Sequence, residues 1–321
     1  MRRTALIGVK IAVSLALLAY LLSTTDLAAL ERKVRSADLV DMLAAVVCFV
    51  LMLALATWRW QMLLGALGAP APIRRLTASY LVATFFNNFL PSNIGGDFVR
   101  VRDSSRLTGS VATSLAVVGI DRILGFGALY LLAAVAFLLA PPTVRGFAGA
   151  RAVLLGLALL FGFLAYVFFR EGTARWIMSA TRLSSIEWAR AQFEVVQGAV
   201  HAYRAKVTTI WIAGAASVTL QALVVFYYLA VARGLGIPLP TGAAFLMVPL
   251  CTLLQAVPIS FNGWGLREGL FALYFSQLGL PRPSALAFSL VGAGLMVLLS
   301  LSGAFVWMAR GSASSADAAE A

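Results

Sequence analysis

The sequence predicts an all-α integral membrane protein, with about six full transmembrane helices and two broken helical hairpins arranged as an inverted repeat. Composition supports this class, because the 321 residues are 61% hydrophobic and 12% charged, whereas a soluble domain has about 25% charged residues. Apolar runs recur along the whole chain, and the mean hydropathy is +0.91. In addition, two of these runs are too short to cross a bilayer and end in stretches rich in proline and glycine.

The first half of the membrane domain, residues 1–140, opens with two apolar runs of spanning length. The run at 4–22 contains a lysine, is long for a signal peptide and lacks a small-residue cleavage site, so we expect a retained anchor. The run at 39–57 returns across the membrane and ends at the sequence WRW, 58–60. This sequence is typical of a membrane interface.

The third run, residues 77–90, makes only about 21 Å of helix, short of the roughly 30 Å of hydrocarbon. Pro91 follows it and disfavours continuation of the helix. If the chain turns back here, the arginines after the break stay on the same side as those before the run, as the positive-inside rule favours. We therefore expect a broken hairpin. A span at 123–140 follows, and residues 107–119 belong either to the hairpin or to the start of a long kinked span.

The second half, residues 151–310, repeats this order. A span at 152–169 leads into a basic amphipathic segment, 170–206, which we place in the cytoplasm. This segment either lies on anionic lipid or connects neighbouring helices, and we favour the connector. The remaining runs are a span at 209–232, a short run at 242–257 that ends at Pro258, and a span at 285–309.

The two breaks match in detail. In each, an arginine follows the proline at the same spacing, with a glycine between them and an amide side chain before the proline. These matched pairs are Pro91 and Pro258, Gly96 and Gly263, Arg100 and Arg267, and Asn88 and Gln255. Each half has three full crossings, so the second half is inverted relative to the first. Broken helices at matching places in inverted repeats indicate a transporter site near the bilayer midplane.

The chemistry of the breaks suits a polar headgroup. Glycines let the chain turn and approach a ligand closely, free N–H groups at a helix start attract anions, and arginine offers a bidentate fork to phosphate. Charges within apolar runs are costly, which makes them functional candidates. The candidate substrate-binding residues are Asn87, Asn88, Pro91, Ser92, Asn93, Gly95, Gly96, Asp97, Arg100, Asp121, Arg122, Asn262, Gly263, Gly265, Arg267 and Glu268. We expect the two breaks to meet and to shelter a positively charged pocket.

A purely structural role for the charges stays open. Asp97 and Arg100 lie one helical turn apart, and Asp121 could pair with a neighbouring arginine, so both could be ion pairs that only orient helices.

Other classes of function find little support. The net charge of +12 follows from arginines and lysines in cytoplasmic loops, so we expect no nucleic acid as a partner. Cys48 and Cys251 lie inside apolar runs and are expected to be small core residues. The sequence has no phosphate-binding loop and no metal-binding or nucleophile motif, so we expect no cofactor, no metal and no catalytic residue.

Three motifs carry a resemblance to a known family: NNFLPSNIGGDFVRVRDSSR at 87–106, DRILG at 121–125 and PISFNGWGLREGLF at 258–271. The chain resembles the flippase-like membrane domain of bacterial lysylphosphatidylglycerol synthases. In those synthases the membrane domain is held to move aminoacylated phosphatidylglycerol between leaflets, and a separate soluble domain performs the aminoacyl transfer. We expect no such transferase domain here, because only the tail 311–321, predicted to be disordered, follows the membrane domain 1–310.

The resemblance and the breaks together predict a lipid translocase that moves an anionic or aminoacylated phospholipid, or a lipid-linked precursor, between leaflets. Two other interpretations stay open: an accessory or scaffold subunit of lipid or cell-envelope biosynthesis, and an intramembrane lipid-headgroup enzyme with Asp97 or Glu268 as general base. The expected partners are membrane lipids bound through a phosphate headgroup, with a lipid-modifying enzyme or a second copy of the chain left open. We expect a multi-pass protein of the bacterial cytoplasmic membrane with both termini in the cytoplasm.

Overall fold

A computed structural model describes most of the chain, and every regular element in the described part is a helix, which confirms the all-α prediction. The described residues are Tyr20, Ser23, 26–89, 95–147, 149–169, 187–256 and 260–319. Several predictions fall on residues outside these ranges, namely the first span (4–22), the start of the basic segment (170–186), Pro91, Ser92, Asn93 and Pro258.

Four helices of the described part are long and apolar enough to cross a membrane, so the chain is an integral membrane protein. They are α3 (Leu39–Ala66), α6 (Val111–Leu139), α11 (Val207–Gly234) and α14 (Arg282–Ala319). Helix α8 (Ala150–Phe169) corresponds to a fifth predicted span. Side-chain caps fix the start of two of them, because Asp38 accepts from backbone N–H groups of α3 and Ser110 from one of α6.

Helix α6 settles the open assignment of residues 107–119. Helix α5 (Gly95–Thr108) ends where Gly109 takes a φ of +68°, and α6 then runs without interruption from Val111. Most of this stretch therefore belongs to a full span and not to the hairpin.

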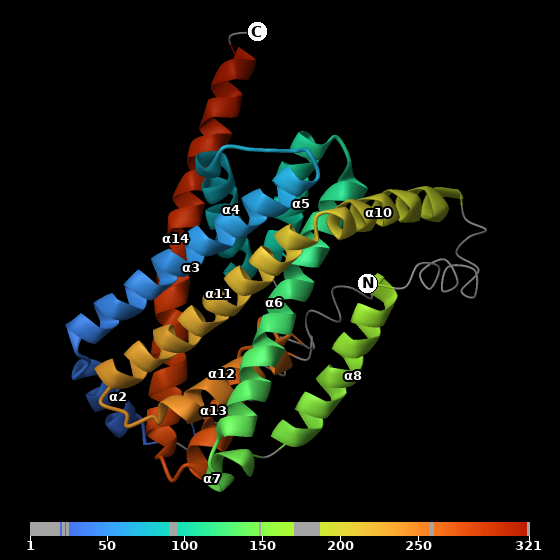
Figure 1. The fold of residues 1–321 in the computed structure, drawn as a ribbon. Coiled ribbons are helices and arrows are strands. Elements are labelled where there is room, and N and C mark those ends of the chain that lie inside the picture. The colour runs from blue at the N-terminus through green and yellow to red at the C-terminus, as the bar shows by residue number, and fades with distance from the viewer. Residues whose placement is uncertain are drawn as a thin grey trace.

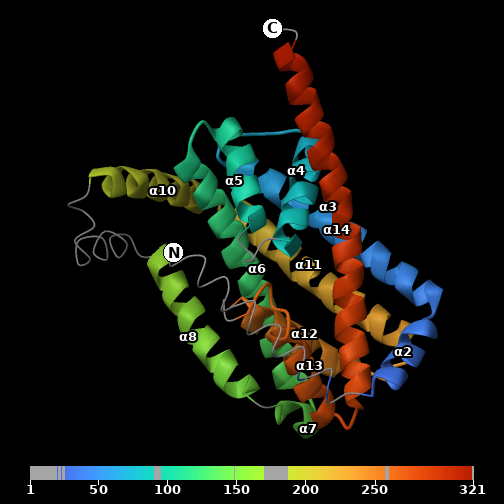
Figure 2. The ribbon, with the colours of Figure 1, turned by 180° about the vertical axis from the view of Figure 1, so that it is seen from behind.

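Two pairs of short helices form the predicted hairpins: α4 (Ile73–Phe89) with α5, and α12 (Thr241–Gln255) with α13 (Leu266–Gln277). At 1.5 Å per residue they measure about 18 to 26 Å, less than the roughly 30 Å of hydrocarbon. Figures 1 and 2 show α4 and α5 toward the end of the molecule where α14 finishes. Helices α12 and α13 lie toward the opposite end, beside α7 (Pro142–Arg145). The hairpins thus enter the fold from opposite ends.

The helix packing repeats between the two halves. Helix α4 packs on α14, and its counterpart α12 packs on α6. Helix α5 packs on α6, and its counterpart α13 packs on α14, while the counterparts α3 and α11 pack on each other. These reciprocal contacts, together with the opposite entry of the hairpins, are those of an inverted repeat.

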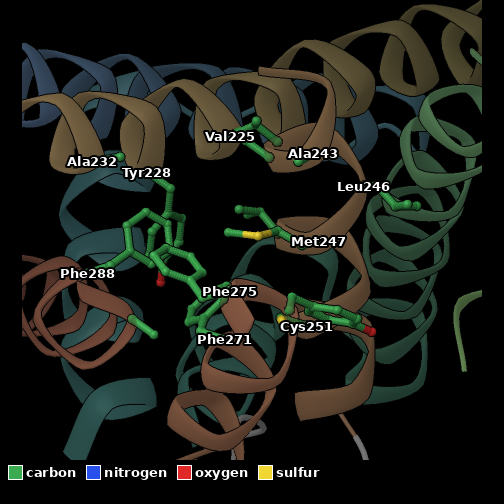
Figure 3. Packing of buried hydrophobic residues seen from close by; sticks show 14 of the residues in the cluster. Val225, Tyr228, Ala232, Ala243, Leu246, Met247, Cys251, Phe271, Phe275 and Phe288 are labelled. Atoms are coloured by element: carbon green, nitrogen blue, oxygen red, sulfur yellow. The ribbon is translucent and has the colours of Figure 1, made fainter. Parts of the chain in front are cut away.

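The larger hydrophobic core lies in the second half, among α11, α12, α13 and α14. Figure 3 shows Tyr228 of α11, Met247 of α12, Phe271 of α13 and Phe288 of α14 directed toward one another. Cys251 is buried in the same cluster, and both cysteines are free, as predicted. This core fixes the second hairpin against its neighbours.

The basic segment, which was predicted to connect neighbouring helices, contains a helix that packs on the rest of the fold. Helix α10 (Glu187–Ala205) is held to the end of α3, because the Tyr203 hydroxyl donates to the Leu63 carbonyl at 2.9 Å and the Lys206 amine to the Ala66 carbonyl at 2.8 Å. This supports its role as a connector.

A short helix not foreseen from the sequence, α2 (Leu27–Arg35), packs on α14. Helix α14 continues past Arg310 to Ala319, where a disordered tail was expected.

Candidate functional site

The tips of the two hairpins touch. The Asn262 side-chain nitrogen Nδ2 donates a hydrogen bond of 3.2 Å to the Asn88 carbonyl at the end of α4. Asn262, Gly263 and Gly265 have φ angles of +49°, +78° and +81°, so the second break turns through the left-handed region that glycine favours. Breaks that enter from opposite ends thus meet inside the fold, as the sequence predicted.

Each break packs a glycine against an amide side chain. The Gly96 N–H donates to Asn87 Oδ1 at 2.7 Å, and a Cβ atom on Gly96 would overlap the Ala83 carbonyl. A Cβ atom on Gly263 would lie 2.7 Å from Gln255 Oε1. The amide that contacts the glycine in the first break is Asn87, one residue before Asn88, the residue that the spacing matches to Gln255.

The first charged cluster is a buried triad of Arg59, Asp121 and Arg100, from α3, α6 and α5. Arg59 Nε lies 2.7 Å from Asp121 Oδ1, and Arg100 Nη1 lies 2.9 Å from Asp121 Oδ2. All three side chains are at most 5% exposed. Arg59 also donates to Ser217 Oγ of α11 at 2.6 Å. One carboxylate thus joins two guanidinium groups, and the triad ties four helices together.

Aromatic rings cover the Arg100 guanidinium. Its Cζ atom lies 4.7 Å from the ring centre of Trp60 and 5.0 Å from that of Tyr80. Cations are attracted to such ring faces, most strongly where water is excluded. The rings therefore help to hold a buried charge.

Asp97 and Arg122 form a second pair beside the triad. Arg122 Nε donates to Asp97 Oδ2 at 2.8 Å, whereas Asp97 Oδ1 lies 3.9 Å from Arg100 Nη1. The expected Asp97–Arg100 pair is thus only a long contact, and Asp121 pairs with distant arginines instead of its neighbour in sequence. The structure joins all four of these predicted residues into one network.

The second charged cluster is closed on itself. Arg267 Nη2 lies 2.6 Å from Glu268 Oε1, and Ser289 of α14 donates to the same oxygen at 2.8 Å. Glu268 Oε2 accepts from the Gly265 N–H at 2.6 Å, and Arg267 lies over the ring of Trp264 at 4.7 Å. Both carboxylate oxygens are therefore occupied, so in this arrangement Glu268 holds the start of α13. The predicted positive pocket is in fact two clusters in which carboxylates face the arginines.

Sequence reasoning missed several partners. The sequence interpretation placed Arg59 and Trp60 at a membrane interface and did not foresee that α3 continues to Ala66 or that both residues are buried. The apolar residues after Trp60 were the signal that the helix continues. Ser217 and Ser289 gave no signal, since nothing in the sequence distinguishes them from other serines.

Within the described residues no group of three or more His, Cys, Asp or Glu side chains could hold a metal ion. Comparison with curated proteins gave no match. A family model described as "Lysylphosphatidylglycerol synthase TM region" matches residues 7–303. The matched range includes both hairpins and both charged clusters.

Proposed function

The chain belongs to the family of the lysylphosphatidylglycerol synthase transmembrane region, and from this premise we propose that it moves a lipid between the two leaflets of a membrane. The family is consistent with a role in membrane lipid biology. The proposed cargo is an anionic or aminoacylated phospholipid, or a lipid-linked precursor. The protein acts without changing the lipid covalently.

The proposal places both hairpins as re-entrant elements with their tips near the bilayer midplane. Their helices are too short to cross, and non-helical backbone at that depth is tolerated only where protein or a polar cavity satisfies it. Arg74 and Arg75 lie in the first turn of α4, and Arg102 and Arg106 lie in the second half of α5, so we place this end of the fold in the cytoplasm. The C-terminus then lies in the cytoplasm of a bacterial cell.

The observation that carries the proposal is the contact between the tips at Asn262 and Asn88. A headgroup that crosses the bilayer needs polar partners in place of water. Two helix breaks that meet inside the fold bring a backbone carbonyl and amide side chains together, and groups of this kind can replace water around a headgroup. The acyl chains meanwhile stay in the surrounding hydrocarbon.

The test is a translocation assay with the purified chain in proteoliposomes that contain a fluorescent phosphatidylglycerol. Dithionite added outside bleaches only lipid in the outer leaflet, so translocation appears as fluorescence loss beyond the outer-leaflet fraction. We expect this loss with the wild type, and strong slowing with Arg100→Ala and with Arg267→Ala. Matched controls are Arg102→Ala and Arg282→Ala, because both arginines are exposed and lie on α5 and α14.

Three results would reject the proposal. Protein-free vesicles and wild-type vesicles could bleach to the same extent, which would favour an accessory subunit. The exposed-site controls could slow translocation as much as the buried-site variants, which would remove the hairpins from the pathway. Mass spectrometry of the vesicle lipids could show a changed headgroup, which would favour an enzyme.

A further inference from the structure

The two charged clusters occupy matching places in the repeat but differ in charge balance. In the first, Asp121 is shared by Arg59 and Arg100, which leaves the triad with one positive charge in excess. In the second, Arg267 faces Glu268 one to one, and Ser289 completes the network. A difference of this kind is not required by the fold, since the surrounding helices repeat.

Arg100 carries hydrogen-bond donors that have no acceptor in the described structure. Arg100 is 4% exposed, yet its Nε and Nη2 atoms are buried without a hydrogen-bond partner in the described structure. Buried side-chain donors are nearly always paired, and a buried guanidinium without a full counter-charge is costly. The aromatic faces over Arg100 attract its charge but do not replace an oxygen acceptor. The triad therefore has unpaired guanidinium donors that suit an oxygen acceptor.

We propose that the Arg59–Asp121–Arg100 triad binds the phosphodiester of a lipid headgroup that carries one net negative charge. This rests on the proposed function and names the part of the fold that selects the cargo. A single excess charge matches a monoanion, and the free edge of the Arg100 guanidinium offers the fork that suits two phosphate oxygens. The Arg267 cluster, already balanced, holds the second hairpin in shape.

Asp97 lies beside the triad, on the side where Arg122 reaches the surface. Its Oδ1 atom lies 3.9 Å from Arg100 Nη1, while its Oδ2 atom pairs with Arg122, whose side chain is 36% exposed. The pair thus stands between the surface and the buried triad. Because Asp97 is a carboxylate beside Arg100 Nη1, its negative charge weakens the attraction between Arg100 and an anion at the Nε and Nη2 edge.

The test is native mass spectrometry of the full chain in detergent, titrated with phosphatidylglycerol, phosphatidylcholine and phosphatidic acid. Wild-type protein should bind phosphatidylglycerol about tenfold more tightly than phosphatidylcholine, and phosphatidic acid no more tightly than phosphatidylglycerol. Arg59→Gln should abolish this preference, because it removes the excess charge. Asp97→Asn should strengthen phosphatidylglycerol binding, because it removes the negative charge beside Arg100. Arg102→Gln, at an exposed site on α5, is the matched control and should change neither.

Opposite signs for Arg59→Gln and Asp97→Asn separate binding from a structural role, since a structural pair would weaken the protein in both variants. The proposal is overturned if wild type shows no preference for phosphatidylglycerol, or if Asp97→Asn weakens binding as Arg59→Gln does. Glycerophosphoglycerol, the same headgroup without acyl chains, must bind far more weakly. Equal binding would mean that the site takes a free phosphodiester. Charge-selective binding without translocation in vesicles would reject the translocase and leave the triad site standing.

Discussion

Gly96 provides a sharp test of how the first hairpin is built. The first turn of α5 presses on α4 at this glycine, where a Cβ atom would overlap the Ala83 carbonyl and lie 2.8 Å from Asn87 Cγ. Both contacts come from one wall of the hairpin, and the nearer one is backbone, which cannot rotate away. Gly96→Ala should therefore push α5 away from α4.

The cost can be worked out from these contacts. Overpacking at a closely packed site costs about 1 to 3 kcal/mol. Separation of the helices also weakens the Gly96–Asn87 hydrogen bond of 2.7 Å, worth about 1 kcal/mol. Against this, alanine in place of glycine stabilises a helix by up to about 1 kcal/mol. The net expectation is a loss of about 1 to 3 kcal/mol in the free energy of unfolding.

The measurement is equilibrium unfolding in mixed dodecylmaltoside and dodecyl sulfate micelles, followed by circular dichroism. Gly119→Ala on α6 is the matched control, since a Cβ atom there meets nothing within 4 Å. It should be neutral or slightly stabilising. If Gly96→Ala proves as stable as Gly119→Ala, the close approach of α4 and α5 does not exist and the reasoning fails.

Three further predictions use the same measurement. Asp121→Asn should lower the free energy of unfolding by about 3 to 5 kcal/mol, because two buried guanidinium groups lose their shared carboxylate. The control Glu31→Gln, at an exposed ion pair, should lower it by less than about 1 kcal/mol. Similar losses in the two variants would contradict this prediction. Asn262→Ala should be about 1 kcal/mol less stable than Asn262→Gly, because only glycine adopts the φ of +49° without strain. Burial raises the pKa of the Tyr203 phenol in the folded state. The stability that the neutral phenol contributes to the fold is therefore complete below about pH 10 and is lost as the pH rises through the folded-state pKa. Tyr203→Phe should therefore flatten the alkaline loss of stability, and an unchanged alkaline slope would refute this.

The spans and the breaks could be predicted from the sequence because the thickness of the bilayer sets the length that an apolar run needs to cross it. A run that ends early at proline and glycine is too short to cross, and the short helices α4 and α12 end just before these prolines. The second predicted span ended at residue 57 because aromatic and basic residues follow it, whereas α3 continues to Ala66. A tryptophan–arginine–tryptophan sequence is typical of an interface, but here the helix turns Arg59 inward to a carboxylate.

Partner choice within the charged clusters could not be predicted. Successive side chains on a helix point about 100° apart, so Asp121 and Arg122 face different neighbours although they are adjacent in sequence. Asp121 meets Arg59 and Arg100, and Arg122 meets Asp97. The packing of α3, α5 and α6 decides which residues pair, and this packing cannot be read from the spacing of the residues along the chain.

The bond between the hairpin tips joins an amide to a backbone carbonyl, and neither group is charged. Such a bond is worth about 1 kcal/mol, which corresponds to only about a fivefold preference for the joined state. A hydrogen bond of this strength can break by thermal fluctuation. On the proposed function, net lipid movement would then follow the difference in lipid abundance between leaflets. Opening of the contact between the hairpin tips would require no external energy source.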